Sequence, residues 1–295
     1  MLKALGFIGL GTMGSPIAGN LRAAGFSLTV YNRTPDRAAP LVSLGARRAA
    51  SPRNCAEGAD AVVTIVADDD AIEAVTFGAD GLLGGLPPGG IHVNMTTTSV
   101  AMTRRLAESH VGRGTRFVAA PVFGRPDRAA ERALWICAAG PPDAVEACRP
   151  VLAATSQGLF VLGPDPVQAA VVKIAVNFQL AAAICTMSEG FALAGKARVS
   201  PQQLLDILNT VQFGTPVYKN YGQRICDEAF DPAGFKLALG LKDVRLVLAA
   251  GDALNVPLPT ASVLRDHLLS GVARGYADLD WAVVSRVIRA DAGLP

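Results

Sequence analysis

Residues 4–31 read ALGFIGLGTMGSPIAGNLRAAGFSLTVY. Apolar runs at 4–8 and 27–31 predict two short strands, and residues 15–24 predict a helix that stops at Gly25. The intervening GxGxxG pattern permits a tight turn, brings a pyrophosphate close to the backbone, and lets helix and strand pack tightly. The stretch therefore predicts a dinucleotide-binding α/β domain; the alternative is a glycine-rich turn in another kind of α/β protein. The residues assigned to the phosphates are Gly9, Leu10, Gly11, Thr12, Met13 and Gly14.

The end of the second predicted strand indicates which dinucleotide binds. Asn32, Arg33 and Thr34 follow it, where an NAD site would place an Asp or Glu to hold the ribose 2′-hydroxyl. A carboxylate there would repel a 2′-phosphate, whereas Arg33 can pair with one and Asn32 and Thr34 can donate hydrogen bonds to it. We therefore predict NADP(H). The alternative is a solvated arginine on a loop.

Further apolar runs predict the rest of a doubly wound, mostly parallel sheet, with strands at 61–66, 91–94, 117–122, 134–138 and 159–162. Ligands of such sheets bind at the carboxyl ends of the strands. On this ground we assign Val66 and Ala67 to the cofactor site and expect one of the hydroxyls at 96–99 to face the cofactor. Capping of the next helix is the alternative role for the hydroxyls of residues 96–99 and for the acidic run at 68–70.

Residues 166–196 form a long apolar segment that predicts one helix, expected to be buried on every side. Lys173 and Asn177 lie four residues apart, so they share one face of it. Burying an unpaired ammonium is costly, and a lysine whose pKa is lowered in a pocket is suited to general acid/base catalysis. The alternative is a structural lysine that reaches out of the core. The segment is long enough to span a bilayer, but its polar residues, which include Gln179 and Glu189, argue against a membrane protein.

The remaining sequence predicts an all-helical second domain. The expected boundary near Gly163 and Pro164 divides the chain into an NADP-binding Rossmann domain at 1–164 and a helical substrate and dimerisation domain at 165–295, with the long helix between them. The helices expected beyond the long one lie at 201–210, 216–227, 235–255, 260–274 and 281–289.

Composition narrows the class of protein further. A chain of 295 residues with 51% hydrophobic residues can hold two domains with much interior or a large subunit interface. A formal net charge of +2 without a basic cluster argues against nucleic-acid binding. The five cysteines show no metal-ligand spacing, which predicts reduced thiols, a cytoplasmic location and no metal site. The glycine-broken N-terminus fits neither a signal peptide nor an anchor.

In combination these motifs resemble the β-hydroxyacid dehydrogenase family, which includes 3-hydroxyisobutyrate dehydrogenase, glyoxylate/succinic semialdehyde reductase and 6-phosphogluconate dehydrogenase. The resemblance covers nearly the whole chain. The matching segments are GFIGLGTMG at 6–14, the threonine-rich stretch at 96–99, Ala120-Pro121-Val122 with Gly124, Lys173 with Asn177, and Phe235 through Lys242-Asp243.

This resemblance implies a Rossmann domain, an interdomain helix and a helical domain through which a homodimer or tetramer assembles. It implies NADP-linked oxidoreduction of a small β-hydroxyacid, aldehyde or ketone. Lys173 would be the catalytic lysine and Asn177 would help to position the substrate. Thr97 would contact the cofactor, and Lys242 would lie beside the nicotinamide and the substrate.

The sequence departs from the family where the substrate is expected. The family pattern APVSGG is here Ala120 to Arg125, so Phe123 replaces a serine that helps to hold the substrate carboxylate. Phe123 would narrow the pocket or make it apolar, and Arg125 is either a replacement anion site or a surface arginine. We assign Phe123, Gly124 and Arg125 to the substrate pocket. Phe178 also stands where the family often has a second asparagine.

Two other functions stay open. Imine reductases share this fold and cofactor preference, but the position that matches Lys173 is typically Asp or Tyr in them, which counts against this alternative. A cofactor-binding module without catalysis is the second alternative. Inactive relatives lose the lysine, so its retention argues against that as well.

Overall fold

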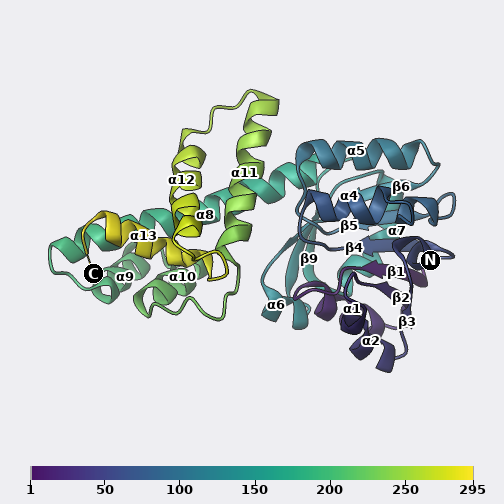
Figure 1. The fold of residues 1–295 in the computed structure, drawn as a ribbon, viewed down its shortest axis with the longest axis horizontal. Coiled ribbons are helices and arrows are strands. Elements are labelled where there is room, and N and C mark those ends of the chain that lie inside the picture. Colours follow the sequence, from purple (N-terminus) through teal and green to yellow (C-terminus); the bar gives the residue numbers. More distant parts are fainter. Residues whose placement is uncertain (1, 295) are drawn as a thin grey trace. The chain divides into compact units, whose positions relative to one another are not determined.

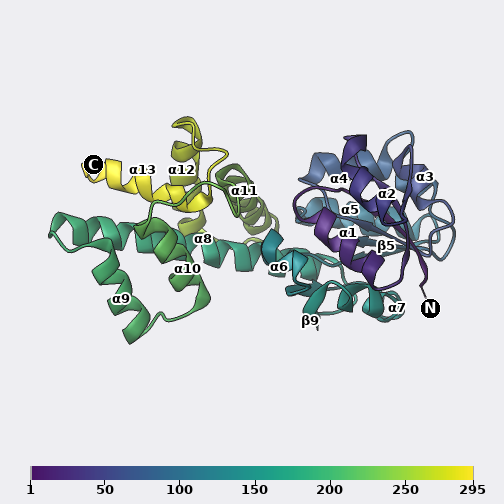
Figure 2. The same ribbon diagram turned by 90° about the horizontal axis from the view of Figure 1, so that it is seen from below.

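A computed structural model describes residues 2–294 of the chain (Figures 1 and 2). It forms two compact units, the first ending at Lys173 and the second beginning at Ile174. The division falls inside helix α8 (Val167–Lys196), whose limits agree with the helix predicted at 166–196. The domain boundary expected at 164/165 stays a prediction.

The first unit contains a six-stranded parallel sheet in the order β3-β2-β1-β4-β5-β6. The chain starts in the middle of this sheet and winds outward in both directions, as in dinucleotide-binding folds. The predicted Rossmann fold is therefore confirmed. The strands are β1 (Ala4–Ile8), β2 (Ser27–Tyr31), β3 (Arg47–Arg48), β4 (Ala61–Thr64), β5 (Ile91–Asn94) and β6 (Arg116–Ala119).

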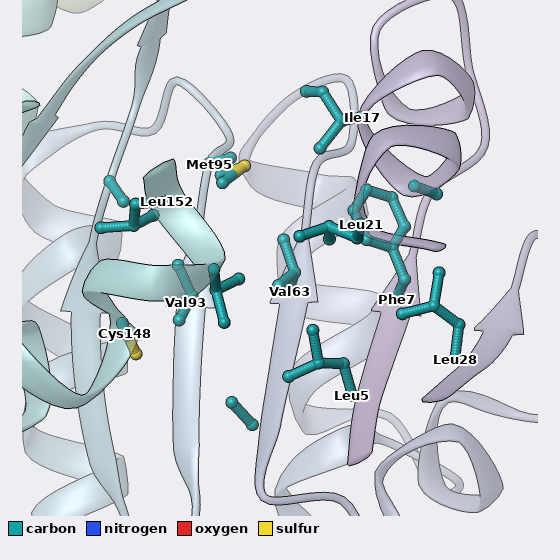
Figure 3. Close-up of a cluster of buried hydrophobic side chains, with 14 of the residues drawn as sticks. Leu5, Phe7, Ile17, Leu21, Leu28, Val63, Val93, Met95, Cys148 and Leu152 are labelled. Atoms are coloured by element: carbon teal, nitrogen blue, oxygen red, sulfur yellow. The ribbon is translucent and has the colours of Figure 1, made fainter. Parts of the chain in front are cut away.

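Helices cover both faces of this sheet, and Figure 1 shows α4 and α5 on one side and α1 and α2 on the other. Along β1, Phe7 lies beside Leu21 of α1 (Figure 3), in a cluster that also includes side chains of α2 and α7, whereas Ile8 packs with α3, because successive side chains of a strand point to opposite faces. Each such buried side chain contributes about 1.5–3 kcal/mol. The helices are α1 (Gly14–Ala23), η1 (Pro35–Ala38), α2 (Ala39–Ser43), α3 (Pro52–Ala56), α4 (Asp69–Phe77), η2 (Leu82–Gly84), α5 (Val100–Val111), α6 (Pro126–Ala130) and α7 (Pro142–Ala153).

A second, three-stranded sheet consists of β7 (Val122–Phe123), β8 (Leu134–Ala138) and β9 (Ser156–Val161). β7 pairs antiparallel with β8, and β8 pairs parallel with β9. The expectation that the last two strands complete the main sheet was therefore wrong. The strand expected at 117–122 divides at Pro121, which has no N–H to donate to a ladder.

The second unit is helical, as predicted. Its helix α9 begins with a capping box, in which Ser200 and Gln203 satisfy each other's backbone N–H groups. The predicted helix at 281–289 starts as a 3₁₀ turn before it becomes α-helical. The helices after α8 are α9 (Pro201–Val211), α10 (Pro216–Cys226), α11 (Leu237–Leu254), α12 (Pro259–Ala273), η3 (Trp281–Val283) and α13 (Val284–Asp291).

One stripe of α8 is not buried within the single chain, contrary to the expectation from its composition. Val176 and Leu193 are 45% and 76% exposed, and Gln179, Thr186 and Glu189 between them are exposed as well. These positions are three, seven, three and four residues apart, which are one- and two-turn spacings, so they lie on one face of the helix. By length and composition alone, α8 is the one helix within residues 2–294 that could cross a membrane, a test that core helices of soluble proteins also pass.

Candidate active site

The glycine-rich turn between β1 and α1 is shaped to receive phosphates. Gly9 has a φ of +103°, which L side chains rarely adopt, and a Cβ there would overlap the carbonyl oxygen of Ile65. A Cβ at Gly14 would overlap the carbonyl oxygen of Gly9, so α1 packs closely against the turn. A Cβ at Gly11 would meet no atom within 4 Å. The backbone at Gly11 therefore faces open space that a pyrophosphate can approach.

Helix α1 directs its N-terminus at this turn. No side chain caps the helix and its first turn holds no acidic residue, so the positive end of the helix dipole is not neutralised by its own chain. The predicted contact residues differ here: Leu10 is buried in the core, whereas Thr12 is exposed and Met13 is half-buried. The turn can thus offer backbone N–H groups, with Thr12 and Met13 at its surface.

Asn32 holds the turn in place, a role that the sequence did not suggest. Its Oδ1 accepts a hydrogen bond of 2.9 Å from the backbone N–H of Leu10, and its Nδ2 donates one of 2.9 Å to the carbonyl oxygen of Thr34. The amide group that was expected to donate to a phosphate is therefore engaged with the backbone on both sides.

A pocket of about 220 Å³ lies at the end of β2, beside Arg33. None of its lining residues is acidic, which agrees with the absence of the ribose-binding carboxylate noted in the sequence. Arg33 is exposed, and a second arginine, Arg48, also lines the pocket. The lining residues are Tyr31, Asn32, Arg33, Pro35, Ala38, Arg48, Ala49 and Ala50.

The exit of β4 lies directly against the glycine-rich turn. A Cβ at Gly9 would lie 3.1 Å from Cγ1 of Val66, so Val66 forms part of the wall beside the turn. The backbone N–H of Val66 donates to Oγ1 of Thr96 at 3.0 Å, which ties the loop after β4 to the loop after β5. Asp68 accepts from the N–H of Ala71 and caps α4, so this part of the acidic run is a helix start.

The hydroxyl residues at 96–99 have different roles, and three of them, Thr96, Thr97 and Thr98, line one pocket. Ser99 caps α5 by accepting from the N–H of Met102, and Thr98 shares a hydrogen bond of 3.0 Å with Thr103. Thr97 is half-buried beside Lys173. The narrow pocket that contains both is lined by Thr96, Thr97, Thr98, Ala119, Pro121, Ala170 and Lys173.

Lys173 is 9% exposed, and its Nζ lies 4.8 Å from the centroid of the Phe123 ring. This is a cation–π distance, so Phe123 contacts the lysine head group as well as narrowing the pocket. The buried Cys137 thiol lies near the same charge. Burial raises the pKa of Cys137 to about 11, and the Lys173 charge offsets this only in part, so the thiol stays neutral at physiological pH.

The structure places Gly124 and Arg125 differently from Phe123. Gly124 has a φ of +137°, and a Cβ there would lie 2.6 Å from Cδ2 of Leu134, so this position requires glycine. The Arg125 guanidinium pairs with the carboxylate of Asp127 at 3.5 Å and does not line the Lys173 pocket. Phe123 and Lys173 are brought together, whereas Arg125 is not brought to them.

The second unit carries a polar cluster around the buried Asp243, which is 2% exposed. Asn177 donates to Oδ2 of Asp243 at 2.6 Å, and the Nζ of Lys242 lies 3.1 Å from its Oδ1. The second contact has an ion-pair distance but not hydrogen-bond geometry, and within residues 2–294 Oδ1 has no hydrogen-bond donor. Asp243 thus connects the two predicted residues of this unit, although the sequence showed it only as part of a motif.

A buried polar chain beneath the threonine loop was also not predicted. Thr115 contacts Nδ1 of His110 at 2.8 Å, and Nε2 of His110 lies 2.9 Å from Nδ1 of His92. Nε2 of His92 lies 2.9 Å from Oγ1 of Thr64, which is 3.0 Å from Oδ1 of Asn94. Burial lowers the pKa of His110 to about 4 and, together with the nearby His110, lowers the pKa of His92 well below its usual range. Both rings are therefore neutral near pH 7.

Known families match both parts of the chain. Residues 4–163 match the NAD binding domain of 6-phosphogluconate dehydrogenase. Residues 168–288 match the NAD-binding region of NADP-dependent 3-hydroxyisobutyrate dehydrogenase. These two matches follow each other along the chain in the order expected for one enzyme of this kind.

Individual proteins agree with these matches. The chain is 46% identical over 282 residues to the uncharacterized oxidoreductase YfjR of Bacillus subtilis, covering 96% of this chain and 98% of that one. It is 32% identical over 285 residues to glyoxylate/succinic semialdehyde reductase 1 of Arabidopsis thaliana, covering 97% and 98%. The structure of 3-hydroxyisobutyrate dehydrogenase from Mycobacterium tuberculosis, solved with L-serine, matches with a TM-score of 0.89 and 25% identity, covering 98% and 100%.

Proposed function

Because this chain belongs to the β-hydroxyacid dehydrogenase family of NAD(P)-dependent oxidoreductases, we propose that it interconverts the alcohol and carbonyl groups of a small β-hydroxyacid, aldehyde or ketone with NADP(H). The observation that carries this proposal is Lys173, buried beside Thr97 with its ammonium over the Phe123 ring. A buried, ionisable group next to a row of hydroxyls is suited to proton transfer.

A bound nicotinamide supplies the redox chemistry. The Gly9–Gly14 turn, Val66, Ala67 and Thr97 bind and orient the cofactor in this proposal. In the oxidative direction the neutral amine of Lys173 takes the proton of the substrate hydroxyl. In the reductive direction its ammonium gives a proton to the carbonyl oxygen, and its low exposure keeps water from competing.

In this proposal Phe123 and Gly124 are the substrate residues of the first unit, and Phe123 makes the side of the pocket at Lys173 apolar. The family resemblance assigns Asn177, which donates to Asp243, and Lys242 to substrate positioning. A screen of aldehydes, hydroxyacids and cyclic imines with NADPH tests the proposal: turnover confined to cyclic imines would favour imine reduction, and binding of NADPH without turnover of any class would favour a non-catalytic module.

We expect at least a tenfold preference for NADP(H) over NAD(H). The pocket beside Arg33 lacks a carboxylate, and a charge-assisted contact to the 2′-phosphate is worth about 1.5–3 kcal/mol. Calorimetric dissociation constants for NADPH and NADH measure this directly. Equal affinities, or tighter binding of NADH, would show that this pocket does not select the cofactor.

We also propose a homodimer that buries the exposed stripe of α8. Val176 and Leu193 give this stripe apolar contacts at both ends, and the half-buried Ala183 and Gly190 allow a partner helix to approach closely. Sedimentation at micromolar concentration should show a dimer, and Leu193→Glu should shift it toward monomer. Leu44→Glu, at a leucine that is 61% exposed and lies outside the stripe, should leave the dimer intact. A monomeric wild-type chain would contradict this assembly.

The cytoplasm remains the expected location. All five cysteines, Cys55, Cys137, Cys148, Cys185 and Cys226, are unpaired thiols. Unpaired thiols are typical of proteins in reducing compartments, whereas secreted domains use cysteines in disulfides.

A further inference from the structure

The pocket at the end of β2 has a second cationic wall that the sequence pattern did not reveal. Arg33 and Arg48 are 15 positions apart in the chain, and both line the same volume of about 220 Å³. A water molecule occupies about 30 Å³ in the liquid, so this space can take a phosphate group with part of a sugar.

Strand pairing explains how Arg48 reaches this place. β3 contains only Arg47 and Arg48, and it pairs parallel to β2 with Thr29 opposite Arg47 and Val30 opposite Arg48. Parallel strands end at the same edge of a sheet, so Arg48 leaves β3 beside the point where β2 leads into Asn32 and Arg33. This is the edge at which doubly wound sheets bind their ligands.

Arg47 and Arg48, the two residues of β3, have different surroundings. Nε of Arg47 donates to Oγ1 of Thr29 at 3.3 Å, and Arg47 does not line the pocket. Successive side chains of a strand point to opposite faces, so Arg48 extends away from Thr29. Arg47 is therefore a matched control for Arg48: it has the same charge and is adjacent in sequence, but lies outside the pocket.

Charge balance indicates what the pocket binds. Within residues 2–294, neither the Arg33 nor the Arg48 guanidinium has a hydrogen-bond or ion-pair partner, and no acidic residue lines the space between them. Two guanidinium groups that line one pocket without a carboxylate repel each other, and a bound anion would offset this repulsion. The Asn32 amide is engaged with Leu10 and Thr34, so the arginines are the main donors available to that anion.

We infer that Arg48 is a specificity-determining residue that binds the 2′-phosphate of NADP(H) together with Arg33. The inference rests on the proposed use of NADP(H). A phosphate monoester offers several oxygens to two guanidinium forks, whereas the neutral ribose 2′-hydroxyl of NAD(H) offers no charge to either. Arg48 should thus raise the affinity for NADP(H), which carries the 2′-phosphate, and have little effect on the affinity for NAD(H), which does not.

Calorimetric titration of the full chain tests this without any enzymatic readout. Wild type, Arg48→Ala, Arg47→Ala and Arg33→Ala are titrated with NADPH, NADH, adenosine 2′,5′-bisphosphate and ADP. Arg48→Ala should weaken NADPH and the bisphosphate by about tenfold or more, the usual effect of losing a charge-assisted contact. It should change NADH and ADP by less than about twofold, as should Arg47→Ala for every ligand. Arg48→Lys should restore binding in part, because lysine keeps the charge but not the fork.

Three outcomes would count against the inference. They differ in whether they also contradict the proposed use of NADP(H). A wild-type chain that prefers NADPH, combined with unchanged binding by Arg48→Ala, overturns the role of Arg48 alone and leaves selection to Arg33. Equal losses in Arg47→Ala and Arg48→Ala show a diffuse basic surface without a specific contact. A wild-type chain with no preference for NADPH contradicts the cofactor proposal itself, and the inference with it.

Discussion

Lys173→Ala is expected to lower turnover on the best substrate by about 10²–10⁴, the usual contribution of a positioned general acid or base. The lysine head group lies in the narrow pocket beside Thr97 and over the Phe123 ring, and no other ionisable group lines that pocket. Binding of NADPH should change little, because in our proposal its phosphates are held by the glycine-rich turn and the Arg33 pocket. Steady-state kinetics and calorimetry on the same protein separate the two effects.

Three further variants make this test specific. Lys173→Met keeps most of the side-chain volume without the ammonium and should be as slow as the alanine variant. Lys173→Arg should not restore activity, because a guanidinium does not release its proton at working pH. Lys196→Ala removes an exposed lysine from the last turn of the same helix and should turn over like wild type. Full turnover by Lys173→Ala would exclude this mechanism and leave imine reduction, with protonation from another group, as the leading alternative.

Asp243→Ala should destabilise the protein by about 3 kcal/mol. Removal of one member of a buried charged pair is costly, because Asn177 and Lys242 lose the carboxylate that they contact. The 2.6 Å hydrogen bond from Asn177 and the contact of Lys242 both end on this carboxylate. Loss of the group that orients Asn177 should also reduce turnover by about 10², because small displacements of a positioning residue are costly. Urea unfolding at constant protein concentration measures the first effect, and steady-state kinetics the second.

Two further variants serve as controls: Asp243→Asn tests the contribution of the charge, and Asp252→Ala tests the effect of removing any aspartate from α11. Asparagine can still accept the hydrogen bond from Asn177 but has no charge for Lys242, so its loss of stability should lie between wild type and Asp243→Ala. Asp252 is exposed on the same helix, and its replacement should change the free energy of unfolding by less than about 0.5 kcal/mol. If Asp243→Ala unfolds at the same urea concentration as wild type, the cluster does not stabilise the helical unit.

The parts of the fold that local sequence determines were predicted well. β2 and β5 have the predicted limits, and α8 begins within one residue of its expected start, because apolar runs bounded by glycine or proline carry their own boundaries. The assignment of β8 and β9 to the main sheet failed because an apolar run does not specify its pairing partner. In the folded chain, β8 pairs with β7, which is separated from β6 by the break at Pro121.

The site was predictable to the same extent. The Gly9–Gly14 turn could be proposed from a continuous motif, and Lys173 from its place in an apolar helix together with the family resemblance; their roles stay predictions. Asp243 could not be connected with Asn177 because they are 66 positions apart, and Arg48 could not be placed beside Arg33 without the pairing of β2 with β3. The engagement of Asn32 with the backbone likewise depends on the position of Leu10, 22 residues earlier.

The pair of neutral histidines under the threonine loop has a consequence for proton order. One proton lies between Nδ1 of His92 and Nε2 of His110, and its position fixes every other proton in the row. If His92 carries it, Thr64 donates to His92 and Thr115 donates to the carbonyl oxygen of His110; if His110 carries it, Thr115 donates to the ring and Thr64 donates to Asn94. The orientation of the Thr115 hydroxyl is therefore coupled through the two rings to that of the Thr64 hydroxyl, and Thr64 donates to Asn94, where the threonine loop begins, in only one of the two arrangements.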